Sequence, residues 1–354
     1  MITILTSVIS ENGSNKVKFE DSLIDKIKKL DIKNPQQALL VKQILEDWAF
    51  LKDTGINNQL LQDLVFKYST AEKKLKQLNR ELLEKQKKLN EDLAAAAQIQ
   101  KSLLPLNLDP AENLEVAWKF MPCEHMGGDI FNLFQLDDDH WGIYMLDVSG
   151  HGVQAAMVTV SVSQFLQPNS GHLFKRRAGK LRHNRQLRTP AEVLTALDRE
   201  FPFERFNNFF TITYMIINTR SGELRYSNAG HPHSIVLRKD GKRELLQSGG
   251  PAIGIGDFPL LSDQENRYAE GRPQLTPGDK LFIYTDGIVD YQNTEGEFYG
   301  TDRFYQTLEA LRVQSVQRIV EKAVENLLDF GRNAAPLDDI TLLGLMFKKI
   351  GPKV

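Results

Sequence analysis

Four acidic positions share one local setting, in which an aspartate stands at the edge of an apolar, strand-like run. They are Gly127-Gly128-Asp129, Asp147 near the end of residues 141–148, Thr285-Asp286-Gly287 and Asp338-Asp339. Aspartates of this kind are common in turns and helix caps, so each position alone is weak evidence. Four in one region, all next to apolar strand-like runs, predict that their carboxylates converge on one anionic pocket.

Carboxylates gathered without a cation would repel one another, so they would take up protons or bind metal. Oxygen ligands with no cysteine and no histidine pair beside them select Mg²⁺ or Mn²⁺ over Zn²⁺. Two such ions that share an aspartate can activate a bridging water for attack on a phosphoryl group. The residues therefore predict two Mn²⁺ or Mg²⁺ ions as cofactors and no side-chain nucleophile.

Asp147 has the clearest local context of the four. Residues 141–148 are apolar apart from Asp147, and Ser149-Gly150-His151-Gly152 interrupts the run. Apolar residues at helical spacing then predict one face of a helix: Val153, Ala156, Met157 and Val160. A strand would thus deliver Asp147 to its own end, beside a glycine-rich turn that opens a helix.

Composition excludes several classes of protein. The chain has 354 residues with a net charge of -2, 41% hydrophobic and 25% charged residues, which is typical of a soluble globular protein. No basic field favours nucleic acid or an anionic membrane. The single cysteine, Cys123, excludes an internal disulfide and suits a reducing cytoplasm. No run of eighteen apolar residues predicts a membrane span, and the first residues lack a positively charged leader.

The first hundred residues predict helices. For residues 1–60 we expect a helical segment for dimerisation or regulation, with an amphipathic helix over 35–51. Over 61–104 apolar residues recur in steps of three and four, at Leu61, Leu64, Tyr68, Ala71, Leu75, Leu78 and Leu82, and then along one seam at Leu89, Ala96 and Leu103. This repeat predicts a coiled-coil linker helix through which two copies dimerise, ended by Pro105. A long helix lying on its own domain is the alternative.

Residues 105–350 predict one α+β domain. Strand-like runs cover 114–120, 141–148, 209–217, 223–228, 234–238, 280–285 and 340–347, and helical patterns cover 153–166, 190–200 and 315–328. Turns at 137–139 and 219–222 indicate hairpins, so we expect a layered antiparallel sandwich instead of a parallel sheet. A basic insert over 171–188 predicts a solvated loop, or else a flap that docks an anionic or phosphorylated partner.

Residues 97–348 resemble the metal-dependent PPM-type serine/threonine phosphatases, in their bacterial RsbU/SpoIIE-like branch. The stretches that carry the resemblance occur in the family's order: Ile99-Gln100-Lys101-Ser102-Leu103-Leu104-Pro105, Gly127-Gly128-Asp129, Asp147-Val148-Ser149-Gly150-His151-Gly152, Asn228-Ala229-Gly230-His231-Pro232, Thr285-Asp286-Gly287 and Asp338-Asp339-Ile340-Thr341. The resemblance implies two packed antiparallel sheets flanked by helices. It also implies a phosphoserine or phosphothreonine on a STAS-type anti-anti-sigma protein as substrate, and control of activity through the helix that enters the domain.

The resemblance also implies roles for the acids. Asp147 would bridge the two ions and the backbone carbonyl of Val148 would complete one coordination shell. Asp129 and Asp286 would be further ligands, with Asp338 favoured over Asp339 as the ligand of the last pair. Together Asp129, Asp147, Asp286 and Asp338 would hold the metal-bound nucleophilic water.

Some residues depart from the family pattern or stay open. Asn132 stands where the family often has a second aspartate, and no phosphate-binding arginine is evident near the first motif. His151 could meet substrate or stabilise its turn, His231 favours a structural role, and Asp290 reads more readily as an exposed turn acid. A pseudophosphatase scaffold that binds a partner without turnover, and a coiled-coil adaptor with a structural C-terminal domain, are the alternative functions.

Overall fold

The computed structural model describes residues 58–105, 112–123, 126–175, 186–255, 267–332 and 334–348. The helix predicted over 35–51 and the rest of residues 1–57 lie outside the described residues. The chain divides into two compact units, Met1–Asn90 and Glu91–Val354. Within the described residues, no helix is long and apolar enough to cross a membrane.

The predicted heptad segment is helical. Helix α4 spans Asn58–Lys101, and a turn then leads to Pro105. In the first unit its leucine seam is exposed, with Leu75 at 60%, Leu78 at 51% and Leu82 at 63% of full exposure. Its last turns belong to the second unit, where Ala97 and Leu104 are buried. The coiled-coil dimer stays a prediction, because only one chain is described.

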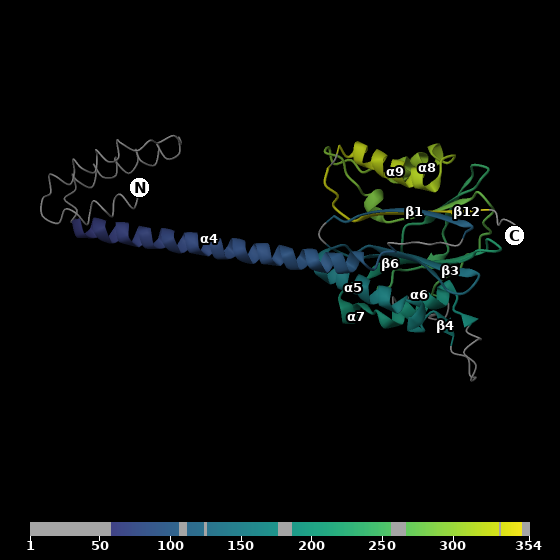
Figure 1. Ribbon diagram of the computed structural model, residues 1–354, viewed down its shortest axis with the longest axis horizontal. Helices are drawn as coiled ribbons and strands as arrows, with labels where there is room; N and C mark the ends of the chain where they lie inside the picture. The colour runs from purple at the N-terminus through teal and green to yellow at the C-terminus, as the bar shows by residue number, and fades with distance from the viewer. Residues whose placement is uncertain are drawn as a thin grey trace. The chain divides into compact units, whose positions relative to one another are not determined.

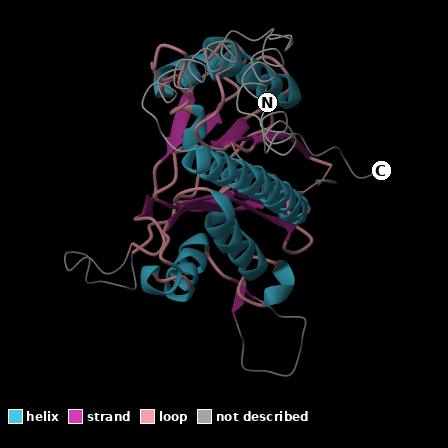
Figure 2. Ribbon diagram, turned by 90° about the vertical axis from the view of Figure 1, so that its left-hand side faces the viewer, coloured by secondary structure: helices cyan, strands magenta, loops and turns pink. Residues whose placement is uncertain are grey.

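The second unit is the predicted α+β sandwich. Its described strands are β1 (Leu114–Met121), β2 (Ile130–Gln135), β3 (His140–Val148), β4 (Phe174–Lys175), β5 (Gln186–Leu187), β6 (Phe210–Asn218), β7 (Leu224–Ala229), β8 (Ser234–Leu237), β9 (Arg243–Leu246), β10 (Gly249–Gly250), β11 (Lys280–Tyr284) and β12 (Ile340–Phe347). They form two five-stranded sheets, ordered β1-β12-β11-β8-β9 and β10-β7-β6-β3-β2, besides the small β4–β5 pair. All neighbours pair antiparallel except β10 and β7. Figure 2 shows the strands between two groups of helices.

The helices cover the outer faces of the two sheets (Figure 1). They are α5 (Gly152–Phe165), α6 (Pro190–Glu200), α7 (Phe203–Phe206), α8 (Thr301–Ala310) and α9 (Val316–Phe330). Helices α5 and α6 pack on the sheet that contains β3 and β6, whereas α9 packs on β1 and β12. Local signals fix their ends: Thr189 and Glu192 form a capping box at α6, and the Ser315 side chain caps α9.

Helix α5 corrects one prediction from the sequence. Val153 and Met157, placed on its apolar face, are 51% and 58% exposed, although Ala156 is buried as the spacing suggested. The helix instead buries a face that includes Ala155, Thr159 and Val162. Apolar residues occur all round α5, so their spacing indicates a helix without identifying the buried side.

Several short elements carried no sequence signal that we used. Strands β2, β9 and β10 and helices α7 and α8 were not predicted, because short runs with mixed composition give no clear period. Part of the basic insert forms the paired strands β4 and β5. Lys175 of β4 forms an ion pair at 2.7 Å with Glu192 of α6. Residues 176–185 of the insert lie outside the described residues.

Candidate metal centre

The four predicted acidic positions converge at one end of the sandwich. Asp147 lies in β3 of one sheet, Asp286 follows β11 and Asp338 precedes β12 of the other, and Asp129 precedes β2. Burial raises the pKa of Asp147 to about 8, and the neighbouring charges of Asp286, Asp338 and Asp339 add to this effect. Segments more than a hundred residues apart therefore bring their carboxylates close enough to repel one another.

Asp129 is among the most enclosed of these acids, at 2% exposure. Burial raises its pKa, and the charges of Asp147 and Asp339 act in the same direction. One of its oxygens, Oδ2, accepts hydrogen bonds from the hydroxyls of Thr285 (2.8 Å) and Thr341. These threonines come from the end of β11 and the start of β12, so the second sheet holds Asp129 in place and leaves Oδ1 for another partner.

The adjacent acids Asp338 and Asp339 have different surroundings. Asp339 is 2% exposed, and its two oxygens accept the backbone N–H groups of Cys123 (2.9 Å) and Asp129 (3.2 Å). Asp338 is more exposed. Its partial desolvation, together with the charges of Asp339 and Asp290, nevertheless raises its pKa. Asp339 thus fixes the loop that carries Asp129, whereas Asp338 faces the other acids.

Glycines let the backbone segments approach closely around this cluster. A Cβ atom on Gly128 would lie 2.6 Å from the Val148 carbonyl oxygen, and one on Gly127 would collide with the Asp339 carboxylate at 1.9 Å. The Gly128 carbonyl accepts the Thr159 hydroxyl of α5 at 2.8 Å. The Gly-Gly-Asp motif is therefore required by packing at the pocket, and it places the Val148 carbonyl beside the acids.

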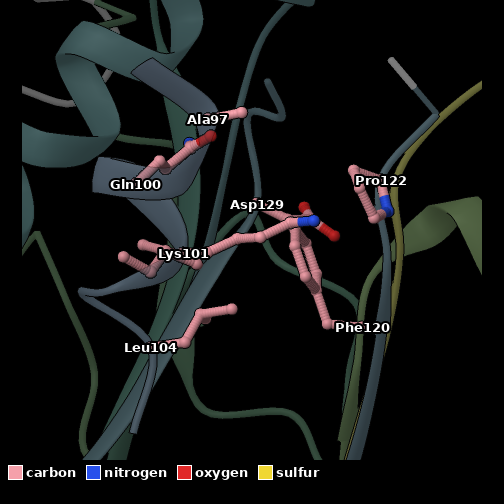
Figure 3. A pocket seen from close by; sticks show the side chains of 8 residues that line it. Ala97, Gln100, Lys101, Leu104, Phe120, Pro122 and Asp129 are labelled. Atoms are coloured by element: carbon pink, nitrogen blue, oxygen red, sulfur yellow. The ribbon is translucent and has the colours of Figure 1, made fainter. Parts of the chain in front are cut away.

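The last turns of α4 reach the same loop. The Gln100 amide donates to the Gly127 carbonyl at 2.6 Å, and its Oε1 accepts the Gly127 N–H at 3.2 Å. Gln100 and Asp129 also line a small pocket between α4 and β1, shown in Figure 3. Its lining residues are Ala97, Gln100, Lys101, Leu104, Phe120, Pro122, Asp129 and Ile130. A rearrangement of α4 would move the backbone that precedes Asp129.

The structure also places the residues that the sequence left open. His151 precedes α5 without capping it through its side chain, and its charge lowers the pKa of Asp338. Asp290 joins the cluster, since its charge raises the pKa values of Asp286 and Asp338. Asn132 lies instead beside the Tyr144 hydroxyl. His231 is buried and bonded to Thr211, as its expected structural role requires.

Sequence reasoning missed the groups that position the acids. Gln100, Thr159, Thr285 and Thr341 hold the Gly127–Asp129 segment, yet none was assigned a role. Gln100 had a usable signal, because it is a polar residue on the side of α4 that carries Ala96 and Ala97. The threonines had none, since hydroxyls are common in turns and strands.

The donor set fits hard divalent cations. Among the described residues, no lysine or arginine forms an ion pair with Asp129, Asp147, Asp286 or Asp338. Buried carboxylates without a cationic partner are costly, and carboxylate and carbonyl oxygens are the ligands that Mg²⁺ and Mn²⁺ prefer. Cys123 Sγ lies within 4.8 Å of oxygens of Asp338 and Asp339 at the edge of this set.

Comparison with known proteins defines the class of the domain. The fold matches the solved "SiaA-PP2C domain of Pseudomonas aeruginosa" with a TM-score of 0.60 and 24% identity, over 74% of this chain and 98% of that one. The family model "Stage II sporulation protein E (SpoIIE)" matches residues 137–348. The chain belongs to the SpoIIE family.

Two curated relatives share this similarity. Protein IcfG of Synechocystis sp. (strain ATCC 27184 / PCC 6803 / Kazusa) is 26% identical over 72% of this chain and 41% of its own length. "Phosphoserine phosphatase RsbP" of Bacillus subtilis (strain 168) is 28% identical over 56% of this chain and 45% of its own length. The chain spans less than half the length of both relatives.

Proposed function

We propose that this chain is a Mn²⁺- or Mg²⁺-dependent protein serine/threonine phosphatase. Its substrate would be a phosphoserine or phosphothreonine on a STAS-type anti-anti-sigma protein in a partner-switching pathway. The observation that carries the proposal is the cluster of aspartates from both sheets, whose pKa values are raised by burial and by the charges of neighbouring acids. A relative named as a phosphoserine phosphatase supports the same activity.

The metal ligands follow from the surroundings of each acid. Asp147 would be shared by two ions, and Asp129, Asp286, Asp338 and the Val148 carbonyl would complete their shells. Asp339 is better suited to positioning than to binding metal, because both of its oxygens accept backbone N–H groups. When bound, the ions supply charge neutralisation for the phosphoryl group and lower the pKa of an attacking water.

The chain's own residues would prepare this chemistry. The Thr285 and Thr341 hydroxyls bond one oxygen of Asp129, which would leave its other oxygen for the ions. We propose that His151 meets the substrate phosphate, because it lies near enough to Asp338 for its charge to lower the pKa of that acid. Because no phosphate-binding arginine is evident near the first motif, the metal ions would be the main ligands of the substrate phosphate.

The N-terminal helices would control this site in a cytoplasmic homodimer. Leu75, Leu78, Leu82 and Leu89 of α4 are exposed in a single chain, which suits a partner helix in a coiled coil. The Gln100 contacts with Gly127 give such a helix a direct connection to the loop that carries Asp129. A change in the pairing of α4 with its partner helix would thereby shift the loop that carries the proposed ligand Asp129.

A hydrolysis assay tests the proposal. Full-length protein with Mn²⁺ should release phosphate from p-nitrophenyl phosphate and from phosphorylated STAS-domain proteins, and Asp147→Ala should abolish both activities. Metal binding without hydrolysis of any of these substrates would favour the pseudophosphatase scaffold. Equal rates for the wild type and Asp147→Ala would contradict the proposed site.

A further inference from the structure

The segment before β6 continues the β3–β6 pairing beyond the acid cluster. Asp147 lies opposite Thr211 in that pairing, so Ser149 and Phe209 form the next opposed pair on the same face. Two hydrogen bonds hold them in this register, because the Ser149 N–H donates to the Phe209 carbonyl at 2.9 Å and the Phe209 N–H donates to the Ser149 hydroxyl at 3.2 Å. Phe209 therefore stands on the face of the sheet that carries Asp147, one step farther out.

Helices α5 and α7 adjoin this segment. Helix α7 ends at Phe206, and the amide of Gln154 in the first turn of α5 donates to the Phe206 carbonyl (3.3 Å) and to the Asn208 side-chain oxygen (2.8 Å). The Asn208 amide in turn donates to the Ser149 carbonyl at 2.8 Å. The start of α5, the end of α7 and the segment before β6 are thus bonded together around the turn that follows Asp147.

Large apolar side chains are exposed on these bonded segments. Val153 and Met157 stand one turn apart on α5 and are 51% and 58% exposed, while Phe203 of α7 and Phe209 are 41% and 39% exposed. We call these four residues the rim patch. Single exposed apolar side chains are ordinary on a protein surface, whereas several on adjoining segments mark a contact site for another molecule.

The polar groups beside the rim patch offer little charge to a partner. Gln154 and Asn208 are uncharged and bonded to each other. Arg205 of α7 lies over the Phe206 ring at 5.0 Å and pairs with Glu200 at 3.4 Å. Because complementary surfaces match in polarity as well as in shape, the partner that fits the rim patch presents apolar side chains.

The place of the rim patch selects the substrate protein as its occupant. A phosphoserine or phosphothreonine side chain extends only a few ångströms from its own backbone. The residues that flank it must therefore lie on the border of the site that the phosphate enters. Phe209 stands at this border, two residues before the cross-strand neighbour of Asp147. The rim patch is thus continuous with the proposed catalytic site.

From this arrangement we propose that the rim patch is the docking surface for the substrate protein, and that it accepts apolar side chains that flank the phosphorylated residue. The inference rests on the proposed metal-dependent phosphatase and adds a substrate preference to it. Phe209 contacts the residues next to the phosphorylated one, and Val153 and Met157 contact apolar side chains farther along the substrate. The acid cluster serves the phosphate, whereas the rim patch selects the polypeptide that carries it.

Two peptides and a matched pair of variants test this docking surface. The phosphoserine peptides have equal length and charge, with leucine and valine around the phosphoserine in the apolar peptide and serine and glutamine in the polar peptide. Val153→Ser alters the rim patch, and Val313→Ser makes the same change at a valine between α8 and α9 that is 80% exposed. Phe209→Ser is a second rim variant. Each full-length protein is assayed with Mn²⁺ on both peptides and on p-nitrophenyl phosphate.

The wild type should hydrolyse the apolar peptide with a kcat/KM about tenfold above that for the polar peptide, because burial of even one apolar side chain can supply such a factor. In Val153→Ser and Phe209→Ser, the kcat/KM for the apolar peptide should fall by about tenfold relative to that for p-nitrophenyl phosphate. Val313→Ser should keep the wild-type preference. Equal kcat/KM values of the wild type for the two peptides, or an unchanged preference in both rim variants, would overturn the docking surface.

Further outcomes separate this inference from its alternatives. Sedimentation velocity reports whether a second copy of the chain occupies the patch: rim variants that dissociate a dimer but keep the peptide preference would overturn substrate docking. Thermal unfolding identifies a rim variant that fails to fold, and the other variant and the wild-type preference then decide. A wild type that hydrolyses neither p-nitrophenyl phosphate nor either peptide with Mn²⁺ would overturn the proposed function, and the docking surface with it.

Discussion

The two ends of β3 both carry aspartates, and their surroundings are opposite. Before the strand, Asp137 accepts the backbone N–H groups of Asp139 (3.0 Å) and His140 (2.8 Å), and Asp139 pairs with Arg220. Burial tends to raise the pKa of Asp137, but these hydrogen bonds outweigh it and the pKa is lowered. The Asp137 carboxylate is thus bonded to the protein's own donors.

At the end of the strand, Asp147 lies near other acids. Burial and the charges of Asp286, Asp338 and Asp339 raise its pKa to about 8. Aspartates at the two ends of one strand thus differ in their surroundings, which lower the pKa of Asp137 and raise that of Asp147. The comparison teaches that a cluster of carboxylates with raised pKa values, and not the mere presence of aspartates, marks the candidate metal site.

The largest expected difference between the two ends is catalytic. Asp147→Ala should lower kcat/KM for p-nitrophenyl phosphate with Mn²⁺ by about a thousandfold or more, because metal assistance contributes several kcal/mol to such reactions. Asp137→Ala should leave kcat/KM within about twofold of the wild type, since surface changes away from a site have small effects. Steady-state kinetics gives kcat/KM for both variants. A comparable loss of kcat/KM in Asp137→Ala would contradict the predicted difference between the two ends of β3.

Metal binding should stabilise the protein through one end of β3 alone. With free Mn²⁺ at a hundred times its dissociation constant, the free energy of unfolding should rise by about 2.7 kcal/mol per site. The rise should vanish in Asp147→Ala and persist in Asp137→Ala, and chelation with EDTA should reverse it. Denaturant titrations with and without Mn²⁺ give the values, and an unchanged rise in Asp147→Ala would place the metal elsewhere.

The raised pKa of Asp147 predicts a pH dependence in the metal-free protein. Between its ordinary value near 4 and about 8, the native state keeps a proton that the unfolded state has released, so the free energy of unfolding falls as pH rises. Asp147→Asn removes this titration. Relative to that variant, the wild type should lose about 1 to 3 kcal/mol across this range, less than the full shift implies because coupled acids share protons. Chemical unfolding at several pH values tests the sign, and a wild type that gains on the variant would contradict it.

The smallest expected effect concerns the helix that reaches the site. Gln100→Ala leaves both backbone groups of Gly127 without these partners, which should lower kcat/KM by about tenfold. Gln98→Ala, an exposed position on the same helix, is the matched control and should have no effect. Equal kcat/KM values for Gln100→Ala and Gln98→Ala would contradict a role of α4 in positioning the acid cluster.

The sequence predicted most of the site's acids and much of the fold for a physical reason. Long apolar strands such as 141–148 and 340–347 have a clear pattern, and the aspartates at their ends stand out because nothing else nearby ionises. The buried face of α5 escaped prediction because its apolar residues surround the helix. The distinction between Asp338 and Asp339 became clear only through the N–H groups of Cys123 and Asp129, which come from distant segments.

The hydrogen bonds of the threonine hydroxyls and of the Gln100 amide could also not be predicted from the sequence. Thr285 and Thr341 matter because two strands end side by side, and their spacing in the chain gives no hint of a shared partner. His231 was expected to be structural, yet its hydrogen bond with Thr211 depends on where β6 lies relative to the turn that follows β7. Local patterns therefore identify candidate ligands, whereas the groups that position them emerge from tertiary contacts.

Anomalous diffraction from crystals of the full-length protein grown with Mn²⁺ tests the central claim most directly. We predict two manganese peaks bracketed by Asp129, Asp147, Asp286 and Asp338, with Asp147 in contact with both. Peaks only beside Cys123 and Asp339, or no peak between the sheets at saturating Mn²⁺, would contradict it.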